Sequence, residues 1–160
     1  MPSSIGQQLK QRRAFRSPEQ EAMLGIRMVA ARMLAPWERF LKTEADLTSS
    51  QYNVLRILRG SHPQSLTAGE IGERTIAREP DITRLVDRLD ARGLVKRARS
   101  ERDRRVVEVE ITGKGLELLR TLEPHSLRMP RALIGHVGAR KLRQLSKVLA
   151  ELLDGMGTYP

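Results

Sequence analysis

The sequence predicts a mainly α-helical protein with one small β-ribbon. Four helix starts are marked by Ser/Thr-led capping patterns or by proline. Segment 95–111 contains an arginine-rich turn, and the residues after this turn alternate between apolar and charged. This pattern is typical of two paired strands. Leucines at helical spacing follow toward the chain end. Together these features predict a winged helix-turn-helix flanked by N- and C-terminal dimerisation helices.

The first three helices begin at capping-box patterns. Ser17–Gln20 offers a serine N-cap, proline at the first helical position and glutamine three residues after the cap, and Thr48–Gln51 and Thr67–Glu70 resemble it. In such a box the hydroxyl accepts a free amide at the helix start, while the Glu or Gln side chain returns to the cap's amide. These starts predict helices at 18–45, 49–59 and 67–75, with Gly60 ending the second and a loop at 61–65.

A fourth helix is predicted to begin at Pro80 and to end at Gly93. Its inward face would hold Ile82, Leu85, Val86 and Leu89, and its outward face Asp81, Thr83, Arg84 and Arg88. An arginine on the early turns of such a helix can donate two hydrogen bonds to guanine in the major groove. We therefore expect Arg84 to read a base and Arg88 to contact a phosphate. The alternative is that Arg88 pairs with a nearby aspartate and carries no sequence information.

The predicted ribbon carries a concentration of positive charge. One strand begins at Val95, the tip spans 100–104, and the second strand buries Val107, Val109 and Ile111 on one face. Between residues 92 and 105 the chain has seven basic and two acidic residues, although region 67–112 as a whole holds eleven basic and ten acidic ones. Charge placed in this way suits the neutralisation of phosphates, so we expect double-stranded DNA as partner.

The total charge is less informative than its position. The formal net charge is +10, but 23 of the 29 basic residues are arginine, a bias that the base composition of coding DNA can also produce. Residues 1–16 carry four basic and no acidic side chains. This basic N-terminal arm either crosses the DNA backbone or is a solvated tail.

Composition argues against several other classes of protein. There are no cysteines, and three histidines lie far apart in the sequence, so we expect neither a metal site nor a cofactor. The sequence has no phosphate-binding glycine loop and no nucleophile–base set, so we do not expect an enzyme. It also has no 18-residue apolar run, and its first residues lack the apolar core of a signal peptide. We therefore expect a cytoplasmic protein that does not bind membranes.

Amphipathic helices at both ends predict a homodimer. The first long helix is more apolar than a surface helix needs to be, and the last helix, at 137–153, repeats leucines at three- and four-residue spacing. A two-fold dimer would match a palindromic site, whereas the alternative is that the terminal helices pack on each other within one chain. Pro124 and Pro130 should kink or split the helix that follows the ribbon. The expected regions are 1–16 (arm), 17–46 (N-terminal dimerisation helix), 47–112 (DNA-binding region) and 113–160 (C-terminal dimerisation helices).

Three segments give the chain a specific resemblance. Segments 47–58 and 80–97, and above all DRRVVEVEITGKG at 103–115, resemble MarR-family bacterial transcriptional regulators over about 17–156. The family pattern places Asp103 and Arg105 before a strand, and Thr112 and Gly115 at the start of the next helix. The resemblance implies a dimeric winged helix-turn-helix whose outer helices form the dimer.

The resemblance also implies roles for the ribbon tip. Arg105 would enter the minor groove while Asp103 holds it through a charge-assisted pair, and Arg102 and Arg104 would substitute for it or touch the backbone. Alternatively, Asp103 and Arg105 lock the hairpin turn. Many relatives bind small aromatic or phenolic anions near their dimer helices. The corresponding residues here would be Trp37, Phe40 and Tyr52, with Arg56 or His62 meeting a carboxylate.

These inferences lead to one expected function and one alternative. The expected function is that of a sequence-specific regulator, by default a repressor, that binds a palindromic operator as a homodimer and responds to a small ligand. The alternative is an architectural or protein-interaction winged-helix module without a specific operator. The outward pair Asp81 and Arg84 argues mildly against the alternative, because that helix face looks built to discriminate between sequences.

Overall fold

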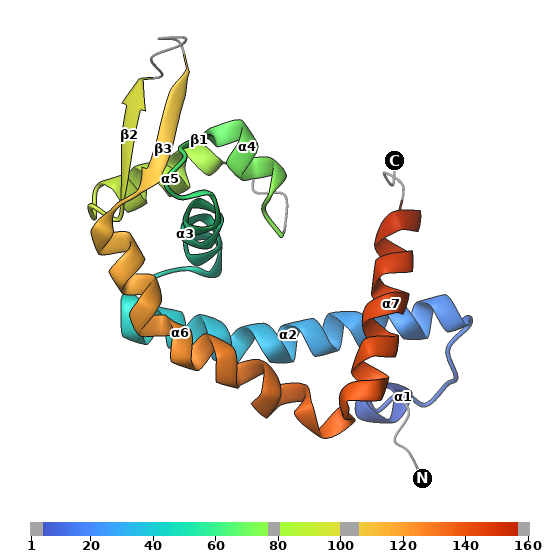
Figure 1. Ribbon diagram of the computed structural model, residues 1–160. Helices are drawn as coiled ribbons and strands as arrows, with labels where there is room; N and C mark the ends of the chain where they lie inside the picture. Colours follow the sequence, from blue (N-terminus) through green and yellow to red (C-terminus); the bar gives the residue numbers. More distant parts are fainter. Residues whose placement is uncertain (1–4, 77–80, 100–105, 157–160) are drawn as a thin grey trace. The chain divides into compact units, whose positions relative to one another are not determined.

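The computed structural model describes residues 5–76, 81–99 and 106–156 (Figure 1). The chain forms two compact units, 1–119 and 120–160. The first contains α1 Ile5–Gln8, α2 Pro18–Ala45, α3 Ser49–Ser61, β1 Leu66–Thr67, α4 Ala68–Glu73, α5 Ile82–Asp90, β2 Val95–Arg99 and β3 Val107–Ile111. Helix α6 (Gly113–Ile134) crosses the boundary, and η1 (Gly135–Val137) and α7 (Ala139–Gly155) complete the second unit. The predicted mainly helical class with a small sheet is confirmed.

The capping patterns place the starts of α2 and α3 where the sequence predicts them, although α3 continues through Gly60 and ends at Ser61. Ser17 Oγ accepts a hydrogen bond from the Gln20 amide at 3.3 Å, and α2 begins at Pro18, but the Gln20 side chain accepts the Arg16 amide at 3.2 Å rather than returning to the amide of the cap. In the second box the Gln51 amide donates to Thr48 Oγ1 at 3.2 Å, and the Thr48 amide donates to Gln51 Oε1 at 2.9 Å. These bonds satisfy amides that an uncapped helix start would leave without partners.

Helix α4 carries a third capping box, in which the acidic partner is ionisable. The Thr67 amide donates to Glu70 Oε2 at 2.7 Å, and the Glu70 amide donates to Thr67 Oγ1 at 3.2 Å. The helix ends at Glu73, two residues earlier than predicted. Hydrogen bonds from the Thr67 amide and then from its hydroxyl lower the pKa of Glu70 below its ordinary value of 4.5.

The lowered pKa of Glu70 makes the stability of this helix start depend on pH. Because the pKa is lower in the folded than in the unfolded state, the stabilisation is present above pH 4.5 and is lost as the pH falls through the folded-state pKa. Glu70→Gln keeps the geometry of the box, as Gln51 does at Thr48, without this titration. We expect the free energy of unfolding, measured in urea between about pH 6 and about pH 3, to fall more steeply for the native chain than for Glu70→Gln. Equal slopes would contradict this coupling.

The sheet has one strand more than the sequence predicts. Its order is β1-β3-β2, with antiparallel pairing throughout, and β1 pairs Leu66 with Val109 and Thr67 with Glu108. A two-residue strand is too short to show an alternating pattern, so the sequence gives no sign of it. Strand β2 begins at Val95, as predicted, which lies opposite Ile111.

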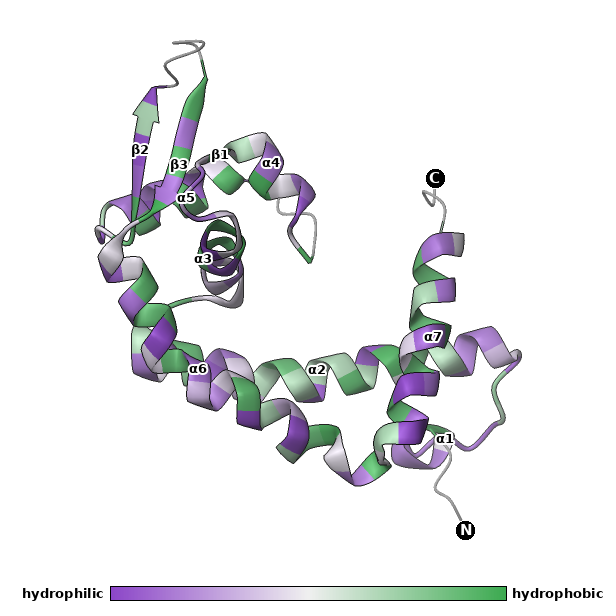
Figure 2. Cartoon of the chain, viewed as in Figure 1, coloured by the Kyte–Doolittle hydropathy of each residue, from purple (hydrophilic) through white to green (hydrophobic). Residues whose placement is uncertain are grey.

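The hydrophobic core of the first unit is aliphatic and lies among α3, α4, α5 and the sheet. Its fully buried side chains are Leu41, Leu47, Val54, Leu55, Leu58, Ile71, Val86, Leu89, Leu94, Val95, Val109 and Leu119. Val109 and Ile111 are buried as predicted, but Val107, at the end of β3 nearest the tip, is 36% exposed. Figure 2 shows that apolar residues also recur along α2 and α7. Of the helices that the structure describes, none has the length and apolar character needed to cross a bilayer.

Of the two predicted effects of proline on the helix after the ribbon, a kink or a split, the split does not occur. Helix α6 runs from Gly113 to Ile134 with Pro124 and Pro130 inside it, and the chain leaves the helix only at Gly135. Each proline removes a single amide donor from the helix. Side chains donate to carbonyls of the same stretch, with Ser126 Oγ at 2.9 Å from the Glu123 oxygen and Arg128 Nε at 3.1 Å from the Pro124 oxygen.

The described part of the N-terminal arm folds against α2. Arg32 Nη1 donates to Gln8 Oε1 at 2.9 Å, and the absence of a side chain at Gly25 makes room for Ile5, whose Cδ1 lies 2.5 Å from where a Cβ would be. Lys10, at φ 53°, ends α1, and the Gln11 amide donates to the Gly6 oxygen at 3.0 Å. These contacts hold Ile5 and Gln8 against α2, whereas the basic residues of the arm, Lys10, Arg12, Arg13 and Arg16, are exposed.

Candidate nucleic-acid interface

Helix α5 is fixed at both ends by local hydrogen bonds. Asp81 is its N-cap, because Asp81 Oδ1 accepts the Arg84 amide at 2.9 Å. The helix therefore begins at Ile82 rather than at Pro80, which lies outside the described residues. Gly93, at φ 67°, ends the helix as predicted, since the Gly93 amide donates to the Asp90 oxygen and the Leu94 amide to the Leu89 oxygen. This pair of bonds is the Schellman motif, which favours glycine at that position.

The two faces of α5 are those that the sequence predicts. Ile82, Val86 and Leu89 are buried, and Leu85 is half-buried. Thr83, Arg84 and Arg88 are exposed. The helix is thus held to the core by one face and presents hydroxyl and guanidinium groups to solvent on the other.

Asp81 has a second role, within the protein itself. Besides capping the helix, its carboxylate pairs with the side chain of Arg84, with Nε and Oδ2 3.4 Å apart. Both side chains remain substantially exposed, so this pair contributes little to stability. Its geometric effect is to restrain the arginine at the start of the exposed face.

Most basic residues of the described ribbon have intramolecular partners. Lys96 pairs with Glu110 across the strands, and Arg97 pairs with Asp87 on α5. Arg99 is exposed and forms no ion pair with any described residue, and the same holds for Arg88. The alternative that Arg88 pairs with a nearby aspartate therefore finds no support among these residues. The tip residues Arg102, Asp103, Arg104 and Arg105 lie outside the described residues.

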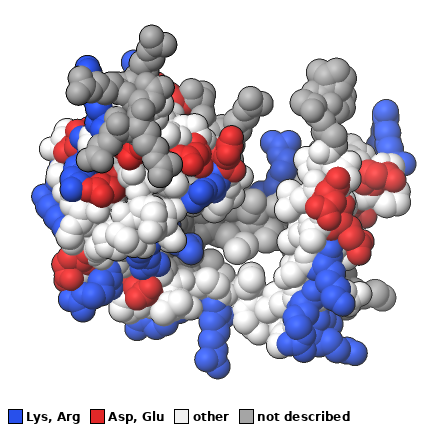
Figure 3. Space-filling model, turned by 45° about the horizontal axis from the view of Figure 1, so that its top comes forward, with Lys and Arg blue, Asp and Glu red and all other residues white. Residues whose placement is uncertain are grey.

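Charges of both signs are mixed over the region from α3 to β3. Figure 3 shows basic and acidic side chains interspersed on its visible face. This agrees with the near-neutral count for residues 67–112. Affinity for DNA would then depend on particular exposed arginines more than on a general positive field.

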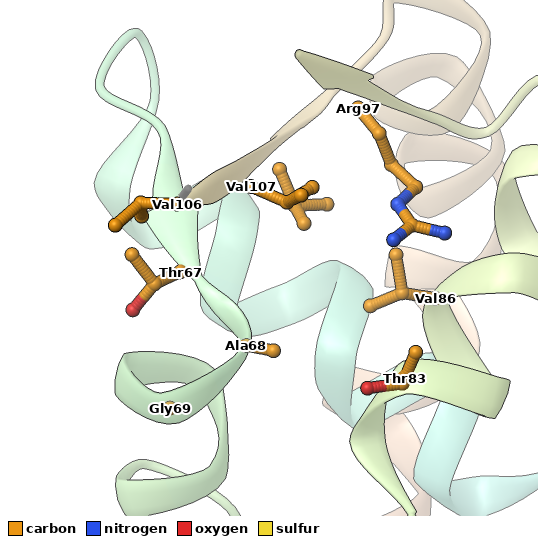
Figure 4. Close-up of a pocket in the computed structure, with 9 residues that line it drawn as sticks. Thr67, Ala68, Gly69, Thr83, Val86, Arg97, Val106 and Val107 are labelled. Atoms are coloured by element: carbon orange, nitrogen blue, oxygen red, sulfur yellow. The ribbon is translucent and has the colours of Figure 1, made fainter. Parts of the chain in front are cut away.

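A pocket of about 330 Å³ lies between α4, α5 and the ribbon (Figure 4). The side chains of Thr83 and Val86 from α5 and of Arg97 from β2 converge on it in that view. Its lining consists of Thr67, Ala68, Gly69, Thr83, Val86, Arg97, Val106, Val107 and Val109. No sequence pattern singles out Arg97, whose place follows from its register opposite Val109. The pocket therefore has valine side chains on its wall and the guanidinium of Arg97 at its edge, and it lies beside the exposed face of α5.

The structure brings together three of the residues predicted to bind a ligand. The ring of Trp37 stacks on Phe40 with centroids 5.5 Å apart and meets Tyr52 edge-on at 4.9 Å. Tyr52 is buried, whereas Arg56 and His62 are exposed. The backbone amide of His62 donates to the Arg59 oxygen at the end of α3. Within the described residues, no group of three or more acidic or histidine side chains could hold a metal ion.

The junction between ribbon and α6 explains the Thr112 and Gly115 pattern. Thr112 Oγ1 donates to the Gly93 oxygen at 2.8 Å and accepts the Gly115 amide at 3.1 Å. A Cβ at Gly115 would lie 2.2 Å from the Leu94 carbonyl oxygen, so only glycine allows this close approach. The two residues thus lock the start of α6 against the turn that ends α5.

Comparisons with known proteins place the chain among transcriptional regulators. A model of the MarR family matches residues 45–106. The HTH-type transcriptional repressor NicR of Pseudomonas putida is 31% identical over 111 residues, which cover 69% of each protein. The chain spans about half of the length of three other curated HTH-type regulators that it matches, namely 59%, 54% and 46%.

Solved structures agree with this placement. The crystal structure of a MarR transcription factor from Planctomyces limnophilus is 41% identical, with a TM-score of 0.65 over 86% of this chain and 98% of that one. A MarR family regulator from Streptomyces coelicolor, solved in complex with DNA, has a TM-score of 0.79 over 92% of this chain and 93% of that one. At 21% identity, the second match supports the fold alone.

Proposed function

Because the chain belongs to the MarR family of transcriptional regulators, we propose that it binds a specific duplex site as a homodimer and represses transcription there. The observation that carries this proposal is the exposed polar face of α5, capped at both ends and buried along its opposite side. An α-helix with its side chains is about 10–12 Å across, which fits a major groove about 12 Å wide. In this proposal Arg84 reads a base, Thr83 lies beside it, and Arg88 contacts a phosphate.

Exposed apolar side chains on the outer helices support the homodimer. On α2 these include Met23, Ile26, Val29 and Leu34, and on α7 Leu145, Val148, Leu152 and Leu153, each between 45% and 72% exposed. Aliphatic surface of this kind is stabilised when it is removed from water, at about 25 cal/mol per Å². A second copy of the chain would supply the cover, and its two-fold symmetry would match a palindromic operator.

The ribbon tip is proposed to contact the minor groove through Arg105. Arg105→Ala should weaken binding to the selected site and reduce the slope of log affinity against log salt by about one, because one phosphate-region cation is removed. The measurement is fluorescence anisotropy of a labelled duplex over a salt series. The control is Arg27→Ala, which removes an exposed arginine from α2 and should leave the slope unchanged. If the slope is the same for Arg105→Ala as for Arg27→Ala, Arg105 acts only within the hairpin turn.

The aromatic cluster of Trp37, Phe40 and Tyr52 supports the proposal that a small aromatic or phenolic anion modulates DNA binding. Arg56 or His62 would meet the anion's carboxylate. Trp37 is the single tryptophan of the chain, so its fluorescence reports directly on occupancy when benzoate is added. The proposal requires that this signal change at the same benzoate concentration at which DNA affinity changes.

Selection of bound fragments from genomic DNA tests the function as a whole. An enriched palindrome, bound by a species that light scattering identifies as a dimer, supports a specific regulator. Enrichment of random fragments would instead indicate an architectural module. A monomer without affinity for duplex DNA at modest ionic strength would contradict the proposal altogether.

A further inference from the structure

Arg92 links the end of α5 to the end of α2. It belongs to the turn that ends α5, yet its guanidinium binds backbone at the end of α2. Arg92 Nη1 donates to the Asp46 carbonyl oxygen at 2.8 Å, and Nη2 donates to the Ala45 carbonyl oxygen at 2.7 Å. In the sequence Arg92 is one of the seven cations at and near the ribbon, whereas in the structure it binds the last carbonyl groups of another helix. A cation at a helix C-terminus also interacts favourably with the helix dipole.

Both sides of this link are fixed by further hydrogen bonds. On one side, Asp46 adopts φ 48° to end α2, and its side chain pairs with Lys42. On the other side, Lys114 Nζ donates to the carbonyl oxygen of Arg92 itself at 2.8 Å. The next residue in the turn, Gly93, accepts the hydroxyl of Thr112. The guanidinium therefore connects two backbone segments that are each held in one conformation.

The two hydrogen bonds from Arg92 depend on angle, whereas the hydrophobic packing around them does not. Leu41 and Leu47, near the end of α2, are buried in the core, and burial of aliphatic surface tolerates small rotations because it has no preferred angle. Two hydrogen bonds from one planar guanidinium to successive carbonyls restrict both distance and angle. Lysine, with a single ammonium on a flexible stem, cannot reproduce that restriction.

We propose that Arg92 is a positioning residue that fixes the angle between α2 and the recognition helix α5, and thereby the separation of operator half-sites that the dimer accepts. This inference rests on the proposed function. Helix α2 has 28 residues and is about 42 Å long, so a change of about 5° at the link moves its far end by about 4 Å. That is close to the rise of one base pair, about 3.4 Å. A loosened link would therefore let the same dimer accept sites whose half-site spacing is wrong.

The test uses the full-length protein and the palindrome obtained by genomic selection. Duplexes are made with the natural half-site spacing and with one base pair inserted or removed at the centre. The native chain should bind the natural spacing at least about tenfold more tightly than either altered duplex. Arg92→Lys, which keeps the charge, should lower this ratio to below about threefold, and Arg92→Ala should do the same. Arg39→Lys, the same change at an exposed position on α2, should leave the ratio unchanged.

The ratio separates positioning from a general loss of folding. If Arg92 only stabilises the fold, a variant with less folded protein binds all three duplexes more weakly and by the same factor, so the ratio stays native and the proposal is overturned. A native chain that binds the palindrome equally well at every spacing also overturns it. Failure of the native chain to select any sequence would instead overturn the proposed function on which the inference depends.

Discussion

Gly115→Ala is expected to destabilise the protein by at least about 3 kcal/mol, the range reached when a buried site is strongly overpacked. The added methyl carbon would lie 2.2 Å from the Leu94 carbonyl oxygen and 2.7 Å from Ile111 Cγ1. The first neighbour is backbone, so it cannot rotate away as the end of a flexible side chain could.

The start of α6 cannot move aside to relieve this clash. Thr112 binds the Gly93 carbonyl through its hydroxyl and the Leu94 carbonyl through its amide, at 2.8 and 3.1 Å. Both carbonyls belong to the turn that ends α5. A shift of α6 would therefore break the Schellman turn or displace buried Leu94 from the core. Gly115→Ala should for this reason also weaken DNA binding in whatever fraction of the protein remains folded.

Gly113→Ala is the matched control for this prediction. It lies in the same first turn of α6, and a Cβ there would meet no atom within 4 Å. Alanine is a better helix former than glycine by up to about 1 kcal/mol, so this variant should be neutral or slightly more stable. The free energy of unfolding from urea titration measures both changes. Equal midpoints and slopes for the two variants would show that the close approach at Gly115 is not restrictive.

Features set by neighbouring residues could be predicted from the sequence. The capping boxes at Thr48 and Thr67, the serine cap at Ser17 and the turn at Gly93 are all confirmed, because each depends on residues within one or two turns. The inward and outward faces of α5 follow in the same way from helical periodicity. Of the predicted kink or split of α6 at proline, the split does not occur, because the loss of one amide can be absorbed within a long helix.

Features set by distant residues could not be predicted. Strand β1 exists because Leu66 and Thr67 meet β3, more than forty positions along the chain. The roles of Arg92 and Arg97 likewise depend on partners contributed by other elements, a carbonyl pair in one case and Asp87 in the other. A sequence shows that these arginines are cationic, but only the fold shows that their guanidinium groups already bind partners within the protein. The candidate DNA contacts are accordingly fewer than the count of basic residues indicates.

Arg84→Ala is expected to reduce the preference for the selected operator over random duplex by about 5- to 150-fold, which corresponds to about 1–3 kcal/mol for one bidentate base contact. Arg88→Ala should instead weaken binding to both duplexes by a similar factor, since a phosphate contact carries no sequence information. The measurement is a competition experiment, in which unlabelled random DNA displaces each variant from labelled operator at fixed salt. It gives, for each variant, the affinity for the operator and its ratio to the affinity for random DNA. Arg84→Lys keeps the charge but not the two parallel donors, so its preference should fall nearly as far as that of the alanine variant.

The pair between Asp81 and Arg84 allows the prediction to be tested one step further. Asp81→Asn keeps a good helix N-cap but removes the negative partner of Arg84 Nε. If the carboxylate restrains the arginine for base reading, this variant should lose part of the operator preference while its thermal midpoint stays close to native. If Asp81 serves only as a cap, the preference should be unchanged. A native preference in Arg84→Ala itself would remove Arg84 as the base reader and leave Thr83, or the tip of the ribbon, as the source of specificity.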